Sequence, residues 1–228
     1  SNCQRFLSAF RKYFPDFEAL FAVKANPNPD ILKIIAEEGF GMDCSSESEA
    51  WISEKLGAAG MYTGNYTSGE EFLFVKDKGM LLNLDDISML PTLARLGMPE
   101  TLSFMVNPGV GKATMESCVL AGPDAKYGVP FEKAPEAYQK AKELGVKHFG
   151  IHMMTGSNVP MDEKDYFAKI AAKLFEIVAD IKKKTSIEIE FMNIGGGFGV
   201  PYHPDEESLD ISAVAESVSD MLDSQCEK

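Results

Sequence analysis

The sequence predicts an α/β fold, a TIM-like (β/α)8 barrel built around a parallel sheet. Short apolar runs alternate with amphipathic stretches of helical length along almost the whole chain. The expected strands are apolar on both faces, which is typical of parallel strands covered by helices. Seven strands are expected, close to the eight that close such a barrel, so we expect the barrel to be incomplete in this chain. An open, doubly wound sheet is the alternative interpretation.

Each expected strand is a short run rich in apolar residues. The strands are expected at residues 19–23, 41–44, 61–63, 81–84, 102–106, 148–152 and 188–194. Helices are expected at residues 29–38, 46–56, 68–78, 86–96, 133–144 and 162–184. Several helical stretches begin with Ser or Asp, which cap helix N-termini, and several are followed by Gly, which ends helices. No linker divides residues 1–228, so we expect one domain.

Charge and composition restrict the partners of the protein. The 228 residues carry 35 acidic and 22 basic side chains, a formal net charge of −13. This charge argues against nucleic acid or an anionic membrane as a partner, and no apolar run approaches the roughly 20 residues of a membrane-spanning helix. A phosphate ligand is not excluded, because backbone N–H groups build phosphate sites locally. The four cysteines form no C-x-x-C pair, which favours a reduced, cytoplasmic protein.

Lys24 is the first candidate for chemistry, because it follows an apolar strand. Burying the charge of a lysine costs free energy, so a lysine that projects from a core strand toward the mouth of a barrel indicates a function. A partly desolvated lysine amine has a lowered pKa and can attack an aldehyde. The alternative is a structural lysine whose amine simply reaches solvent at the end of the strand.

Three adjacent glycines, Gly195, Gly196 and Gly197, follow the last expected strand. Without Cβ atoms in the way, their backbone N–H groups can approach a phosphate closely. The spacing is not that of the dinucleotide-binding G-x-G-x-x-G motif. Phosphate sites in barrels favour the loops after the late strands, although a glycine-rich turn can equally be a plain loop.

His152, Ser157 and Asp43 also lie at or shortly after the ends of expected strands. The Ser157 hydroxyl can bind phosphate, and the Asp43 carboxylate can orient Lys24 or a cofactor. Each residue also has a structural interpretation: His152 as a core histidine, Ser157 as a turn residue and Asp43 as a helix cap. Because all these positions fall at strand C-termini, one shared site is favoured over separate coincidences.

Six segments carry further motifs in a fixed order along the chain. They are residues 21–28, 41–45, 106–110, 126–128, 150–158 and 193–202. In this order they resemble the fold-type III pyridoxal-phosphate decarboxylases, which include the diaminopimelate, ornithine and biosynthetic arginine decarboxylases. Residues 107–110 and 194–202 are most similar to the diaminopimelate branch, and the resemblance covers nearly the whole chain.

The resemblance implies an alanine-racemase-like barrel that binds pyridoxal 5′-phosphate. It implies decarboxylation of a basic or diamino amino acid, most closely the conversion of diaminopimelate to lysine. Lys24 would hold the cofactor covalently, with Asp43 beside it and the cofactor ring. The glycines at 195–197 would hold the phosphate with help from Ser157.

Two positions depart from the family pattern. His152 matches the first histidine of Gly-Leu-His-x-His-x-Gly-Ser and belongs to the implied cofactor site. Met154 stands at the second histidine, which stacks on the pyridine ring in the family, and Met105 stands where the family has an arginine. A methionine can pack against a π face, so stacking is not necessarily lost. A divergent branch is indicated, and a racemase, a cofactor carrier or a non-catalytic relative remain alternatives.

The family's Glu-Pro-Gly-Arg segment and its C-terminal β domain do not occur in the 228 residues. We therefore expect residues 1–228 to be a pyridoxal-phosphate-binding barrel domain, truncated at both ends, of an enzyme that forms a homodimer when intact. The glutamate of the absent segment protonates the pyridine nitrogen in the family. The chain alone is consequently expected to be inactive as a decarboxylase.

Overall fold

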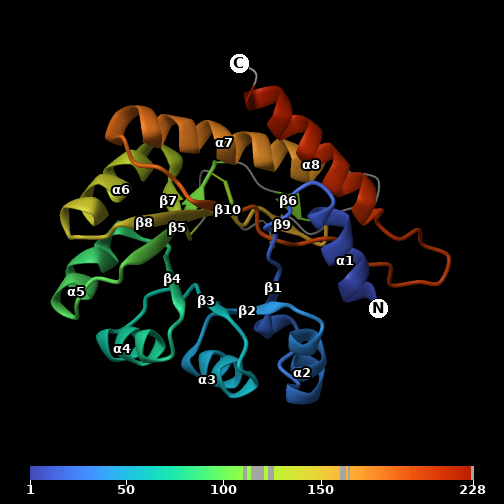
Figure 1. The fold of residues 1–228 in the computed structure, drawn as a ribbon, viewed down its shortest axis with the longest axis horizontal. Helices are drawn as coiled ribbons and strands as arrows, with labels where there is room; N and C mark the ends of the chain where they lie inside the picture. Colours follow the sequence, from blue (N-terminus) through green and yellow to red (C-terminus); the bar gives the residue numbers. More distant parts are fainter. Residues whose placement is uncertain (110–111, 114–120, 123–125, 160–162, 164, 227–228) are drawn as a thin grey trace.

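The structure, a computed structural model, describes residues 1–109, 112–113, 121–122, 126–159, 163 and 165–226. At its centre lies one curved parallel sheet with helices on its outer side (Figure 1). Its main path runs, in spatial order, through β1 (Leu20–Ala22), β2 (Gly41–Cys44), β3 (Gly60–Tyr62), β4 (Leu81–Leu84), β5 (Thr101–Asn107), β8 (His148–His152) and β10 (Phe191–Asn193). The expected TIM-like α/β fold is confirmed. Within the described residues β1 pairs only with β2, and β10 only with β8, so the sheet covers part of a barrel.

The helices follow the strands in the repeating order that the sequence predicts. They are α1 (Asn2–Arg11), α2 (Pro29–Glu37), α3 (Glu47–Leu56), α4 (Gly69–Asp77), α5 (Leu90–Arg95), α6 (Ala134–Glu143), α7 (Tyr166–Thr185) and α8 (Ile211–Cys226). Capping side chains set their starts: Ser46 accepts from the backbone N–H of Glu49, and Ser68 accepts from that of Glu71. Gly57 ends α3 in the left-handed conformation with φ of 64°.

Several boundaries differ from the expectations. Helices α1 and α8 were not among the expected helices, and the strand expected at 188–194 is confined to β10. The stretch 86–96 divides into a 3-10 turn, η2 (Ile87–Met89), followed by α5. The expected start of the long helix at Asp162 lies outside the described residues. A small parallel pair, β6 (Lys112–Ala113) and β9 (Gly156–Ser157), and a short strand, β7 (Val129–Pro130), join the main elements.

Alternate residues of each strand face the helices or the interior of the curved sheet. Leu82, Phe104 and Ile151 are buried in the main core together with helix residues. Asn83 and Ser103 pair in register and occupy the opposite, inward face. Polar side chains therefore gather inside the sheet, while its outer face supplies the hydrophobic contact with the helices.

A second hydrophobic cluster joins α1, α7 and α8 to the loop after β10. In it, the ring of Phe198 stacks on the ring of Phe167 in α7, with centroids 4.1 Å apart. This stacking fixes the loop immediately after the three glycines. No helix in the described part of the chain is long and apolar enough to cross a lipid bilayer.

Candidate functional site

Lys24 lies at the C-terminal edge of the sheet, directly after β1. It belongs to a 3-10 turn, η1 (Val23–Ala25), rather than to the strand itself. Its side chain is exposed, so the chain alone does not desolvate the amine in the way that the sequence suggested. The amine forms no ion pair or hydrogen bond with a described residue, which leaves it available to a ligand.

Two side chains at the same edge, the partly buried Asp43 and the buried His152, respond to the charge of Lys24. Burial raises the pKa of Asp43 to about 6, while the Lys24 charge acts to lower it and the Glu49 charge to raise it. Burial also lowers the pKa of His152 to about 4, and the Lys24 charge lowers it further. Because such charge effects decay with distance, Lys24, Asp43 and His152 lie in one region. The structure thus brings together three of the residues that the sequence singled out.

Asn83 and Thr63 link His152 to the neighbourhood of Asp43, and neither residue was predicted from the sequence. The amide Nδ2 of Asn83 lies 2.9 Å from Nδ1 of His152 and donates to Oγ1 of Thr63 at 3.0 Å. The Thr63 hydroxyl also lies near the carboxyl group of Asp43 and acts to lower its pKa. The signal for Asn83 was present in the sequence, because it is the one polar side chain inside the otherwise apolar strand β4.

The glycine loop packs directly on the segment that follows β8. Gly195 and Gly197 have φ of +75° and +86°, which residues with a Cβ rarely adopt. A Cβ on Gly195 would lie 2.3 Å from the carbonyl oxygen of Met153, and one on Gly197 would lie 2.2 Å from that of Gly156. The close approach of the two segments therefore requires glycine at both positions. A Cβ on Gly196, in contrast, would meet no atom within 4 Å.

Ser157 reaches the glycine loop through the same contact. Its backbone nitrogen would lie 2.9 Å from a Cβ on Gly197, and its hydroxyl makes no hydrogen bond to a described residue. The backbone N–H of Gly197 also lacks an acceptor within the described ranges. An unpaired hydroxyl beside an unpaired backbone N–H suits the oxygens of a phosphate.

Met154 also contacts the glycine loop. Its Sδ accepts the backbone N–H of Gly196 at 3.5 Å and would lie 3.2 Å from a Cβ on Gly195. Sulfur is a weak acceptor, so a phosphate oxygen can replace it at this N–H at low cost. The thioether thus lies beside the expected phosphate site.

Unpaired polar atoms line the inward side of the sheet. Within the described residues, Oδ1 of Asp43, Oδ1 of Asn83, Oδ1 of Asp85 and Oγ of Ser103 are buried without a hydrogen-bond partner. Buried polar groups are normally paired, so such a cluster indicates a polar ligand or ordered water. The donor chemistry fits pyridoxal phosphate: a free amine at Lys24 for an aldehyde, and N–H and O–H donors at the glycine loop for a phosphate.

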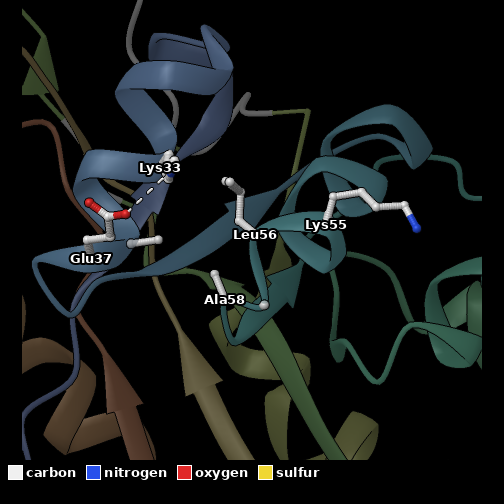
Figure 2. A pocket seen from close by; sticks show the side chains of 7 residues that line it. Lys33, Glu37, Lys55, Leu56 and Ala58 are labelled. Atoms are coloured by element: carbon white, nitrogen blue, oxygen red, sulfur yellow. Dashed lines mark ion pairs between the residues drawn. The ribbon is translucent and has the colours of Figure 1, made fainter.

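A separate surface pocket lies between α2 and α3, where Lys33, Glu37, Leu56 and Ala58 line it (Figure 2). Ala58 precedes β3, so the pocket lies at the N-terminal end of the strands, opposite to Lys24. Its ion pair between Lys33 and Glu37 is 4.0 Å long and exposed, and such pairs contribute little to stability. None of the predicted site residues lines this pocket, and it is not the candidate site.

The fold and the site can be compared with known proteins. The family profile described as "Pyridoxal-dependent decarboxylase, pyridoxal binding domain" matches residues 1–228. A diaminopimelate decarboxylase of Methanothermobacter thermautotrophicus is 36% identical over 226 residues, which cover 97% of this chain and 52% of the relative. Protein TabA of Pseudomonas amygdali pv. tabaci is 35% identical over 219 residues, with coverages of 94% and 49%.

A solved structure shows the same arrangement of elements. The diaminopimelate decarboxylase from M. jannaschii in complex with L-lysine matches with a TM-score of 0.87 and 25% identity. The match covers 100% of this chain and 55% of that chain. The chain therefore spans about half the length of the curated relatives it matches. These matches confirm the resemblance that the ordered motifs carried.

Proposed function

We propose that this chain, which belongs to the pyridoxal-dependent decarboxylases as their pyridoxal-binding domain, holds pyridoxal 5′-phosphate covalently through Lys24. One observation carries the proposal: the unpaired Lys24 amine lies at the same edge of the sheet as Asp43 and His152, whose pKa values respond to its charge. Removing the Asp43 carboxyl and the His152 imidazole from water at a strand end costs free energy unless they bind a partner. A shared ligand accounts for their position and for that of Lys24.

The other residues have complementary roles in this proposal. Residues 195–197 and Ser157 bind the phosphate, because their donors lie together and include two without a described acceptor. Asp43 holds a negative charge near the Lys24 nitrogen, and His152 stays neutral, so it adds no repulsion to that nitrogen. Met154 packs beside the bound group in place of a histidine. Pyridoxal phosphate, when bound, supplies the electron sink for loss of carbon dioxide from an amino acid.

The activity of the whole protein is a further part of the proposal. We propose that the protein containing this chain converts diaminopimelate to lysine, and is a cytoplasmic homodimer. The support is that relatives of 32–36% identity from three archaea are diaminopimelate decarboxylases. Because the chain spans about half of these relatives, residues 1–228 are proposed to be one barrel domain, and the remaining length to complete the site.

Chemical trapping tests the assignment of Lys24. The chain is incubated with pyridoxal phosphate, reduced with borohydride and digested, and the modified peptide is identified by mass spectrometry. We expect the added mass on Lys24, and we expect Lys24→Ala to lose it together with the visible absorption of lysine-bound cofactor. Lys33→Ala is the control, because Lys33 is an exposed lysine at the opposite end of the strands. Full labelling of Lys24→Ala would show that another lysine holds the cofactor.

A second experiment tests the activity. The full-length protein, loaded with pyridoxal phosphate, is incubated with diaminopimelate, and carbon dioxide and lysine are measured together. We expect equal amounts of both from the full-length protein and neither from residues 1–228 alone. Turnover of ornithine or arginine in preference to diaminopimelate would reject the substrate while leaving the Lys24 assignment intact.

A further inference from the structure

A chain of hydrogen bonds crosses the inward side of the sheet from β8 to the end of β3. It begins at Nδ1 of His152, passes through the amide of Asn83 and reaches the hydroxyl of Thr63, which lies near the carboxyl group of Asp43 and acts to lower its pKa. His152 and Asn83 are 6% and 1% exposed, so water competes little for these bonds. The chain joins His152 to two residues outside the candidate site, and the second of them, Thr63, neighbours Asp43.

The direction of the chain follows from what each group can donate. The amide nitrogen Nδ2 of Asn83 only donates, and it carries two protons. Oγ1 of Thr63 accepts the first of them at 3.0 Å. The second proton of Nδ2 is directed at Nδ1 of His152, 2.9 Å away. A nitrogen that accepts a hydrogen bond carries no proton, so the proton of the neutral imidazole lies on Nε2.

We propose that Asn83, oriented by Thr63, holds His152 as the tautomer protonated at Nε2, ready to donate to an oxygen of the bound cofactor. Nε2 makes no hydrogen bond to a described residue, so its N–H is available for this purpose. Asn83 and Thr63 are positioning residues, because they act through His152. The tautomer of His152 does not depend on the proposed function. The donation from Nε2 to a cofactor oxygen rests on that function.

The charges around the ring are consistent with a neutral histidine. Burial and the Lys24 charge hold the pKa of His152 at about 4, and no other charged group affects it measurably within the described residues. Around pH 7 the ring is therefore uncharged, and the question is only which nitrogen holds the proton. In a free neutral imidazole both forms are accessible, and a hydrogen bond to one nitrogen selects between them.

Nitrogen-15 NMR reads the tautomer directly, because protonated and unprotonated ring nitrogens resonate in separate ranges. The chain contains three histidines, His148, His152 and His203, so variants of the other two assign the signals of His152. At pH 7 and without cofactor, we expect Nδ1 of His152 in the unprotonated range and Nε2 in the protonated range. The opposite pattern, or an even mixture of both tautomers, would overturn the proposal.

Substitutions test the direction of the chain. Asn83→Asp replaces the donating amide with an acceptor of similar size, so we expect the Nδ1 signal of His152 to move into the protonated range. Thr63→Val removes the group that orients Asn83, and we expect a mixture of tautomers, which Thr63→Ser corrects. Ser103→Ala is the matched control, because Ser103 is the buried register partner of Asn83 and does not belong to the chain. If Asn83→Asp does not fold, the Thr63 pair still decides, and an unchanged tautomer in Thr63→Val contradicts the proposal.

Cofactor addition separates the two parts of the proposal. When pyridoxal phosphate is bound to the wild-type chain, we expect the Nε2 signal of His152 to shift, while Nδ1 remains unprotonated. A confirmed tautomer whose Nε2 signal does not respond, in a chain labelled at Lys24, would reject the donation to the cofactor and leave the covalent anchor intact. Absence of labelling at Lys24 would reject the proposed function and leave the tautomer as measured.

Discussion

Met105 is the register partner of His152 on the neighbouring strands β5 and β8. Asp85 directly follows Leu84, the register partner of Phe104, so it takes the position beside Met105 on the side away from His152. Asp85 is 7% exposed, and its Oδ1 has no partner within the described residues. Burial raises the pKa of Asp85 to about 6. A thioether thus separates a buried histidine from a buried acid that no described cation compensates.

Met105→Arg is expected to pair with Asp85. A guanidinium beside the carboxylate favours its ionised form, so the pKa of Asp85 should fall clearly below 6. Carbon-13 NMR of the aspartate carboxyl signals over a pH titration measures this change. Met105→Leu, which keeps the apolar volume, is the control and should leave the pKa unchanged. An unchanged pKa in Met105→Arg would show that the two side chains do not meet.

Asp85→Asn is expected to change how stability depends on pH. The pKa of Asp85 rises from 3.8 to about 6 on folding, so between these values the folded state keeps a proton that the unfolded state releases. The contribution of this group to the free energy of unfolding is therefore fully present below pH 4 and is lost as the pH rises through 6. The loss is on the order of 2 kcal/mol at pH 7.

The measurement for Asp85→Asn is denaturant unfolding of variant and wild type at pH 4 and pH 7. We expect the free energy of unfolding of the variant, relative to that of the wild type, to increase by on the order of 2 kcal/mol between pH 4 and pH 7. Because Asp43 and His152 also titrate over this range, the difference between the two proteins is the informative quantity. A constant difference between pH 4 and pH 7 would contradict the raised pKa.

Gly197→Ala is expected to damage both the fold of the loop and cofactor binding. The substitution strains a residue with φ of +86° and drives a methyl group into the carbonyl oxygen of Gly156. We expect a loss of about 2 kcal/mol in the free energy of unfolding, and weaker binding of pyridoxal phosphate by titration. Gly196→Ala is the matched control for stability, since a methyl group there meets no atom within 4 Å. Equal stability losses in the two variants would show that the loop packs differently.

Tyr138→Phe is expected to destabilise the fold without reaching the candidate site. Tyr138 belongs to α6, and its buried hydroxyl donates to the carbonyl oxygen of Gly150 in β8 at 2.6 Å. Its removal leaves that carbonyl with one bond fewer, and we expect a loss of about 1–2 kcal/mol in denaturant unfolding. Tyr202→Phe, at an exposed tyrosine, should leave stability unchanged. A Tyr138→Phe variant as stable as the wild type would contradict the role of this bond.

The sequence predicted the elements whose boundaries depend on local chemistry. The strands at 41–44, 81–84 and 148–152 match the structure because a glycine with positive φ, at Gly39, Gly79 and Gly145, ends the helix before each of them. Helix α8 was missed because its apolar face is buried by α1 and α7, a contact that no local pattern specifies. The strand at 188–194 was predicted too long, since only the residues that pair with β8 are extended.

Some residues of the candidate site could be predicted from the sequence, and others could not. Its strand-end position was predictable for Lys24, Asp43 and His152, because parallel strands end at one edge. Asn83 and Thr63 were not, because their importance lies in hydrogen bonds between strands that are distant in sequence. The exposure of Lys24 was also unpredictable, since it depends on the 3-10 turn after β1.

The unpaired edge of β10 affects how readily residues 1–228 associate with one another. Within the described residues, one side of β10 bonds to β8 and the other side has no strand partner. Unpaired strand edges can recruit strands from other molecules, and β10 is protected only by its length of three residues, because it carries no charged side chain or proline. Residues 1–228 on their own should therefore self-associate with rising concentration, and light scattering of purified samples would report the onset.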